Sequence, residues 1–105
     1  MKNRKIQQPE EEITRIRIPK QPEVLGVVEM MLGGDRLRVK CEDGNLRICR
    51  IPGRMRKKVW IRVGDLVLIE PWKDQFVDRG DVIFRYTSTQ ANWLKRKGFV
   101  KISIE

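Results

Sequence analysis

Histidine is absent from the 105-residue sequence, and Cys41 and Cys49 are its only cysteines. Histidine is the commonest general base, and ordinary zinc sites take four Cys or His ligands, so neither kind of site is supported. The carboxylates show no metal-binding spacing, and no glycine-rich phosphate loop or nucleophile elbow occurs. We therefore expect no enzyme, metal or cofactor. The cysteines are interpreted as two small buried hydrophobes of a cytosolic protein, ahead of a disulfide.

Long apolar runs are also missing. The longest, residues 66–69, is far too short to cross a bilayer. The first residues, MKNRKIQQPEEE, contain no apolar segment of the kind found in signal peptides. We expect a cytoplasmic protein with no membrane partner.

Acidic residues are missing from residues 45–64, although the chain has 14 Asp and Glu in total. The same stretch holds seven cations: Arg47, Arg50, Arg54, Arg56, Lys57, Lys58 and Arg62. The whole chain has a formal net charge of +9. Clustered cations repel one another, so this segregation favours a polyanionic partner over a role in solubility alone. Phosphates would supply bidentate arginine contacts and release counterions.

Short apolar segments separated by turns predict a β-protein. The expected strands are residues 23–32, 35–41, 46–51, 66–70 and 81–86. Gly26 predicts a bend or bulge in the first strand, and Arg50 a bulge or the end of the third. A short helix is expected over residues 88–97, with Thr87 and Gln90 forming a capping box.

These elements predict an all-β fold, a five-stranded OB-fold barrel with a short C-terminal helix and a flexible N-terminal tail. An SH3-like barrel is the main alternative. The OB-fold is favoured by the long first strand and by the excursion between the third and fourth strands. The expected boundaries are a tail over residues 1–20, the OB-fold domain with its helix over 21–98, and a short tail over 99–105.

Cations alternate with apolar residues in the second strand. Leu37, Val39 and Cys41 are expected to face inward. The outward cations are Arg36, Arg38 and Lys40. In the third strand we expect Leu46 and Ile48 to face inward, which would place Arg47 among the outward cations. OB-folds commonly bind oligonucleotides on this face, whereas the alternative is an ordinary solvated surface.

The aromatic residues are few, and Trp60 is the one that lies within the basic stretch. It would either stack on a base or anchor the loop onto the barrel, and we favour anchoring. Trp72, Phe76 and Phe84 are expected in the core or at a barrel end. The lack of aromatics on the second and third strands favours phosphate and shape contacts with folded RNA.

Two segments resemble a known family. They are RICRIPGRMRKKVWIRVGDLVLIEPW (residues 47–72) and DVIFRYTSTQANWLKRKG (residues 81–98), which resemble translation initiation factor 1A in its archaeal form. The resemblance covers residues 22–98. It implies an OB-fold factor that binds small-subunit ribosomal RNA at the aminoacyl-tRNA site. It also implies a role in initiation-complex assembly with initiator tRNA, mRNA and other initiation factors, and we expect a monomer.

In this family the loop between the third and fourth strands contacts ribosomal RNA. Together with the outward strand cations, the resemblance predicts an RNA-binding set: Arg36, Arg38, Lys40, Arg47, Arg50, Gly53, Arg54, Arg56, Lys57, Lys58, Trp60 and Arg62. The chain ends in VKISIE, without the long acidic tail of eukaryotic members, so functions of that tail are not expected. The alternatives are a general single-stranded nucleic-acid binder and a basic adaptor for an acidic protein.

Overall fold

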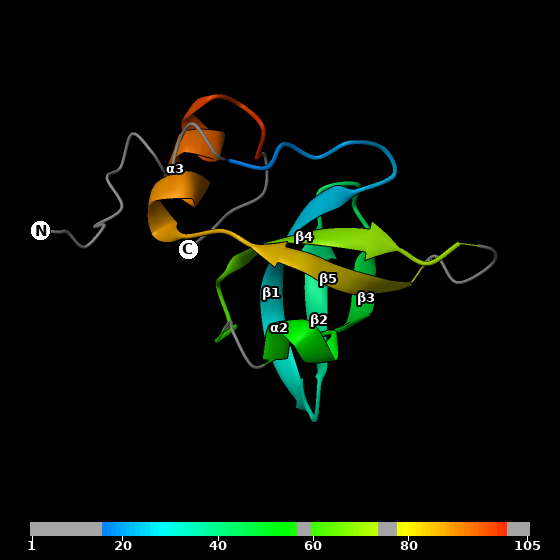
Figure 1. The fold of residues 1–105 in the computed structure, drawn as a ribbon. Coiled ribbons are helices and arrows are strands. Elements are labelled where there is room, and N and C mark those ends of the chain that lie inside the picture. Colours follow the sequence, from blue (N-terminus) through cyan, green and yellow to red (C-terminus); the bar gives the residue numbers. More distant parts are fainter. Residues whose placement is uncertain (1–15, 57–59, 74–77, 101–105) are drawn as a thin grey trace, which may run out of the picture.

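The computed structural model describes residues 16–56, 60–73 and 78–100. In this part of the chain the strands form a closed barrel in the order β1-β2-β3-β5-β4 (Figure 1). The strands are β1 Val24–Gly33, β2 Arg36–Cys41, β3 Leu46–Arg50, β4 Leu66–Pro71 and β5 Arg79–Arg85. β3 and β5 pair in parallel, and the other neighbours are antiparallel. This is OB-fold topology, so the predicted fold is confirmed over the SH3-like alternative.

Strand β1 closes the barrel because it pairs with β4 through its first half and with β2 through the remainder. Gly26 lies where the two pairings overlap, opposite both Cys41 and Val67. A Cβ at Gly26 would lie 2.4 Å from Val39 Cγ1, so only glycine fits without displacing that side chain. We predicted a bend or bulge at Gly26, but the register shifts of β1 lie at Val28/Met30 and Met31/Gly33, and Gly26 is paired on both sides.

The barrel interior is filled by one apolar cluster drawn from all five strands. It includes Val28, Leu37, Val39, Val67 and Val82, each at most 1% exposed. Both cysteines are free and belong to this cluster, so the prediction that they are buried is confirmed.

A second cluster lies between the barrel and helix α3 (Ser88–Arg96). The predicted capping box is present: Gln90 N–H donates to Thr87 Oγ1 at 3.2 Å, and Thr87 N–H donates to Gln90 Oε1 at 3.0 Å. Leu94 is fully buried and attaches the helix to the barrel. Ile16 and Val100, which we expected in the flanking tails, pack on the same cluster because they complete its apolar surface.

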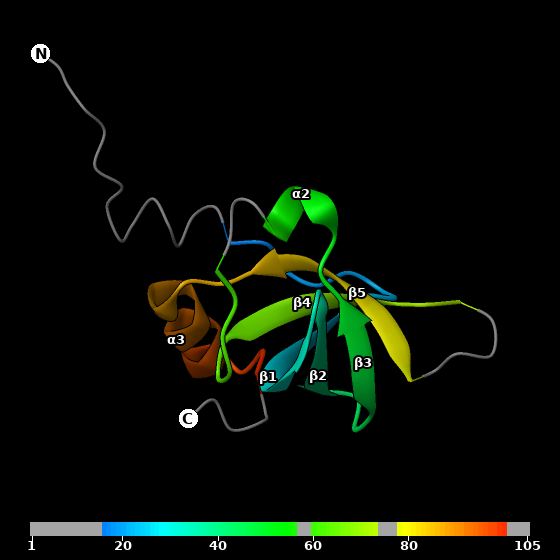
Figure 2. The same cartoon turned by 90° about the horizontal axis from the view of Figure 1, so that it is seen from below.

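Helix α2 (Gly53–Arg56) is a single turn between β3 and β4. It lies apart from α3 in both views of the barrel (Figures 1 and 2). Met55 is its buried residue, whereas Arg54 and Arg56 are exposed. The Ile51 N–H, just before the helix, donates to the Asp35 carbonyl at 2.8 Å. This bond places α2 beside the turn that joins β1 and β2.

Candidate nucleic-acid interface

The outer surface of β2 and β3 carries a group of cations that we call the basic face. It consists of Arg36, Arg38, Lys40 and Arg50. The β2–β3 register pairs Arg36 with Arg50, Arg38 with Ile48 and Lys40 with Leu46. Directly paired residues point to the same side of a sheet, so these side chains share one surface. Arg50 joins this face and is the last residue of β3, in line with the prediction that the strand ends there.

Arg47 is not part of the basic face, contrary to our prediction. It pairs with the fully buried Val39, so its side chain points into the barrel and is 4% exposed. The expected inward positions of Leu46 and Ile48 are also wrong, and Leu46 is 52% exposed. The inward positions of β3 are thus shifted by one residue from the predicted alternation, and this shift places Arg47 beside an acid of the turn before β3.

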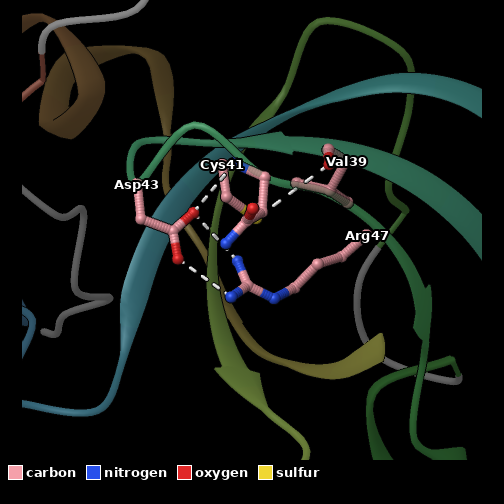
Figure 3. A network of polar contacts seen from close by, with 5 residues as sticks. Val39, Cys41, Asp43 and Arg47 are labelled. Atoms are coloured by element: carbon pink, nitrogen blue, oxygen red, sulfur yellow. Dashed lines mark hydrogen bonds and ion pairs between the residues drawn. The ribbon is translucent and has the colours of Figure 1, made fainter. Parts of the chain in front are cut away.

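That acid is Asp43, and the Arg47 side chain extends so that its guanidinium faces the Asp43 carboxylate (Figure 3). Arg47 Nη1 donates to Asp43 Oδ1 at 3.1 Å, and Nη2 donates to Oδ2 at 2.9 Å. The hydrogen bonds from Arg47 hold the pKa of the Asp43 carboxyl below its ordinary value. Arg47 therefore has a structural partner of its own and is removed from the candidate interface.

The α2 segment, residues 53–56 with residues 60–62, continues the cationic surface beyond β3. Gly53, Arg54, Arg56 and Arg62 are all exposed. Lys57 and Lys58 lie outside the described residues. Each described cation of the segment therefore has access to an external phosphate.

Trp60 is 77% exposed, so the interpretation of Trp60 as an anchor is wrong. Met55 and Ile61 anchor the segment instead, since they are 8% and 6% exposed and belong to the barrel cluster. Trp60 forms one wall of a hollow of about 290 Å³ that Arg56 and Met31 also line. An indole beside a guanidinium at the rim of a hollow is well suited to contact a base or sugar.

A second hollow, of about 320 Å³, opens beside the basic face. It is lined by Arg36, Ile48, Cys49, Arg50, Trp72 and Arg79. Trp72 is 39% exposed and not in the core, because its Nε1 donates to Asp81 Oδ1 at 3.1 Å and holds the ring at the surface. Phe84 is partly buried against the second cluster, as expected, and Phe76 lies outside the described residues.

Sequence reasoning missed Trp72 and Arg79 as members of this surface. Arg79 begins β5 and is brought beside β3 by the parallel β3–β5 pairing, and Trp72, which follows β4, donates its backbone N–H to the Arg79 carbonyl. No local pattern signals this pairing, because it joins residues about thirty positions apart, such as Arg50 and Asp81.

Among the described residues, no group of three or more His, Cys, Asp or Glu side chains is placed to hold a metal ion. The helices described in the structure include none long and apolar enough to span a membrane. The fold and the surface together define a small OB-fold protein with a cationic, arginine-rich outer face.

Comparison with known proteins identifies the family. The model of the family described as translation initiation factor 1A / IF-1 matches residues 11–105, and the chain belongs to this family. A translation initiation factor 1A from Methanopyrus kandleri is 57% identical over 89 residues, covering 85% of this chain and 79% of the relative. One from Archaeoglobus fulgidus is 51% identical over 94 residues, covering 88% and 96%.

Solved structures agree with the barrel. A translation initiation factor from the Wolbachia endosymbiont strain TRS of Brugia malayi is similar with a TM-score of 0.50 and 34% identity, covering 66% of this chain and 82% of that one. YjeQ from Thermotoga maritima has a TM-score of 0.51 at 22% identity, covering 62% of this chain and 23% of that one, and it shares the fold. The predicted resemblance to archaeal translation initiation factor 1A is thereby confirmed.

Proposed function

We propose that the chain binds small-subunit ribosomal RNA at the aminoacyl-tRNA site and promotes initiation-complex assembly with initiator tRNA and mRNA. The supporting observation is the continuity of the basic face with the α2 segment. Arg50 ends β3, and Arg54 and Arg56 follow directly along the chain, beside the β1–β2 hairpin. A continuous run of exposed cations of this kind is suited to contact successive phosphates of an RNA backbone.

The arrangement favours folded RNA over a flexible single strand. Sequence-tolerant single-strand binding by OB-folds depends on successive aromatic platforms. On the outer side of β2 and β3 the non-cationic positions are Ile48 and Leu46, and neither is aromatic. Trp60 and Trp72 line separate hollows. Phosphate contacts along the face, with Trp60 on the α2 segment, are suited to the shape of folded RNA.

The chain acts in the cytoplasm as a monomer, without catalysis, together with the small ribosomal subunit and other initiation factors. Its membership of the initiation-factor family supports these statements. The two alternatives, an acidic protein partner and arbitrary single strands, are distinguished from this proposal by measuring binding to isolated small ribosomal subunits.

The test is co-sedimentation of the purified chain with isolated small ribosomal subunits across a salt series. We compare Arg54→Ala/Arg56→Ala and Arg36→Ala/Lys40→Ala with a matched control, Lys95→Ala/Arg96→Ala. The control removes the same charge from the exposed end of α3, which lies apart from α2 (Figure 2).

Both test variants should bind more weakly than the control and show a shallower salt dependence. Removing one phosphate contact lowers the slope of log affinity against log salt by roughly 0.7–0.9. Equal losses in all three variants would show attraction by net charge alone. Absence of binding by the parent chain, or binding that survives nuclease treatment of the subunits, would contradict the proposed RNA contact.

A further inference from the structure

Two of the four cations of the basic face form ion pairs with carboxylates, and the two carboxylates come from opposite sides of the face. Arg38 Nε lies 3.3 Å from Glu29 Oε1, and Arg50 Nε lies 3.3 Å from Asp81 Oδ1. Glu29 belongs to β1 and Asp81 to β5, the strands that flank β2 and β3 in the barrel. Within the described part of the chain, Arg36 and Lys40 form no such ion pair. The basic face is therefore bordered by an acid on each side.

The acid on the β1 side is directed outward by a bulge. The β1–β2 register shifts between Val28 and Met30, which leaves Glu29 as the additional residue. Val28 is buried, whereas Glu29 and Met30 are both exposed, so two consecutive residues of β1 point outward. Bulges re-aim side chains in this way. Here the bulge brings the Glu29 carboxylate to Arg38, whose own partner in the register is Met30.

The acid on the β5 side is held by its register and by a ring nitrogen. Asp81 lies opposite Arg50 in the parallel β3–β5 pairing. The same Oδ1 atom accepts a hydrogen bond from Trp72 Nε1 at 3.1 Å, and Oδ2 lies 3.5 Å from Arg50 Nη2. The Asp81 carboxylate is thus held between Trp72 and Arg50, two residues that line the second hollow.

Stability does not account for these two pairs. Arg38 and Arg50 side chains are 40% and 54% exposed, and ion pairs this exposed contribute about 0–1 kcal/mol. Their larger effect is on binding, because a phosphate must compete with the carboxylate for each guanidinium. A phosphate placed at either border also meets a negative charge.

We propose that Glu29 and Asp81 are specificity-determining residues that make the face select folded RNA over flexible single strands. This inference rests on the proposed function for the identity of the preferred RNA. A flexible strand loses conformational entropy for every nucleotide it orders, so its net gain from each contact is small. At Arg38 and Arg50 the competing carboxylates cancel that small gain for a flexible strand. A folded RNA is already ordered and also contacts the α2 segment, so its larger net gain is enough to displace the carboxylates.

The test measures binding of a fluorescent uridine 12-mer by anisotropy between 50 and 200 mM salt. The variants are Glu29→Gln, Asp81→Asn and the double variant. The matched control is Glu23→Gln, which removes the same charge from a residue that also pairs with an arginine, Arg17, at 3.2 Å. Each substitution keeps an oxygen at its position, and thermal unfolding of each variant verifies the fold.

Each freed arginine should add one phosphate contact and steepen the salt slope by about 0.7. The affinity ratio between the two salt concentrations should therefore rise about 2.6-fold for each single variant and about 7-fold for the double variant. Glu23→Gln should leave the slope unchanged. Slopes that stay at the parent value, or a control that changes as much as Glu29→Gln, would overturn the inference.

A second measurement separates this inference from the proposed function. The affinity for small subunits, divided by that for the 12-mer, should fall in the double variant. An unchanged ratio would show general attraction in place of selectivity and would overturn the inference. If the parent chain fails to bind subunits at all, the proposed function fails, whereas the 12-mer slopes still decide whether the carboxylates compete for Arg38 and Arg50.

Discussion

Removing the charge of Asp43 should destabilise the barrel, because it leaves the Arg47 guanidinium buried without its counter-charge. Arg47 is 4% exposed and donates two hydrogen bonds to the Asp43 carboxylate. Its Nε has no hydrogen-bond partner among the described residues, so Asp43 provides the main compensation for burial. The substitution Asp43→Asn keeps the side-chain size and the oxygen that accepts from Asn45 N–H at 3.1 Å, and it removes the charge.

The magnitude follows from the burial of the two partners. Breaking a fully buried ion pair by removing one charge costs about 3–5 kcal/mol. The Asp43 side chain is 40% exposed, so water replaces part of the lost interaction. We therefore expect a loss of about 2 kcal/mol in the free energy of unfolding. In a domain of this size that corresponds to a fall in Tm of about 8–16 °C.

Thermal and urea unfolding followed by circular dichroism measure this loss. The control is Asp78→Asn, which breaks an exposed ion pair with Arg79. In that pair the Asp78 side chain is 64% exposed and the Arg79 side chain 41% exposed. That change should cost less than about 0.5 kcal/mol. If Asp43→Asn costs no more than the control, the assignment of Asp43 as the essential partner of the buried Arg47 is refuted.

The same ion pair predicts a pH dependence. The hydrogen bonds from Arg47 lower the pKa of Asp43 in the folded protein. The stabilisation is therefore complete above the unfolded pKa of about 3.9 and is lost as the pH falls through the lower, folded pKa. The stability difference between the parent and Asp43→Asn should be constant near neutral pH and shrink below about pH 4. A difference that persists unchanged at pH 2 would contradict ionic compensation.

Three further predictions follow from burial and packing. Trp60→Ala should change the unfolding free energy by less than about 0.5 kcal/mol yet weaken subunit binding; strong destabilisation would restore the anchoring interpretation. Gly26→Ala should cost about 1–3 kcal/mol in urea unfolding, because its Cβ would lie 2.4 Å from Val39 Cγ1, and a neutral result would contradict this close approach. Cys41 and Cys49 should react with a thiol reagent only after unfolding, since burial raises the pKa of Cys49 to about 12; rapid labelling of the native chain would count against this.

The fold was largely predictable because its determinants are local. Alternation in β2, the turn glycines and the capping box at Thr87 are readable from neighbouring residues, and each corresponds to an element of the structure. The exposed arginines of the α2 segment were predictable for the same reason, since the absence of nearby acids left them without an obvious intramolecular partner.

The misplaced residues depend on contacts that no short segment encodes. Arg47 looked like a surface cation because alternation was counted from Leu46, whereas the pairing of β2 with β3 and the Asp43 carboxylate turn it inward. Trp60 looked like an anchor because it is large and apolar, but the adjacent Ile61 fills the available space in the core. The positions of Trp72 and Asp81 beside β3 follow from barrel closure, which brings distant strands together.

The central claim is that the basic face and the α2 segment bind small-subunit RNA at the aminoacyl-tRNA site. Chemical probing of the ribosomal RNA in isolated subunits, with and without the chain, tests this most directly. We predict protection concentrated at the aminoacyl-tRNA site in the parent, lost in Arg54→Ala/Arg56→Ala and retained in Lys95→Ala/Arg96→Ala. Protection elsewhere on the subunit, or an identical pattern in all three proteins, would contradict the account.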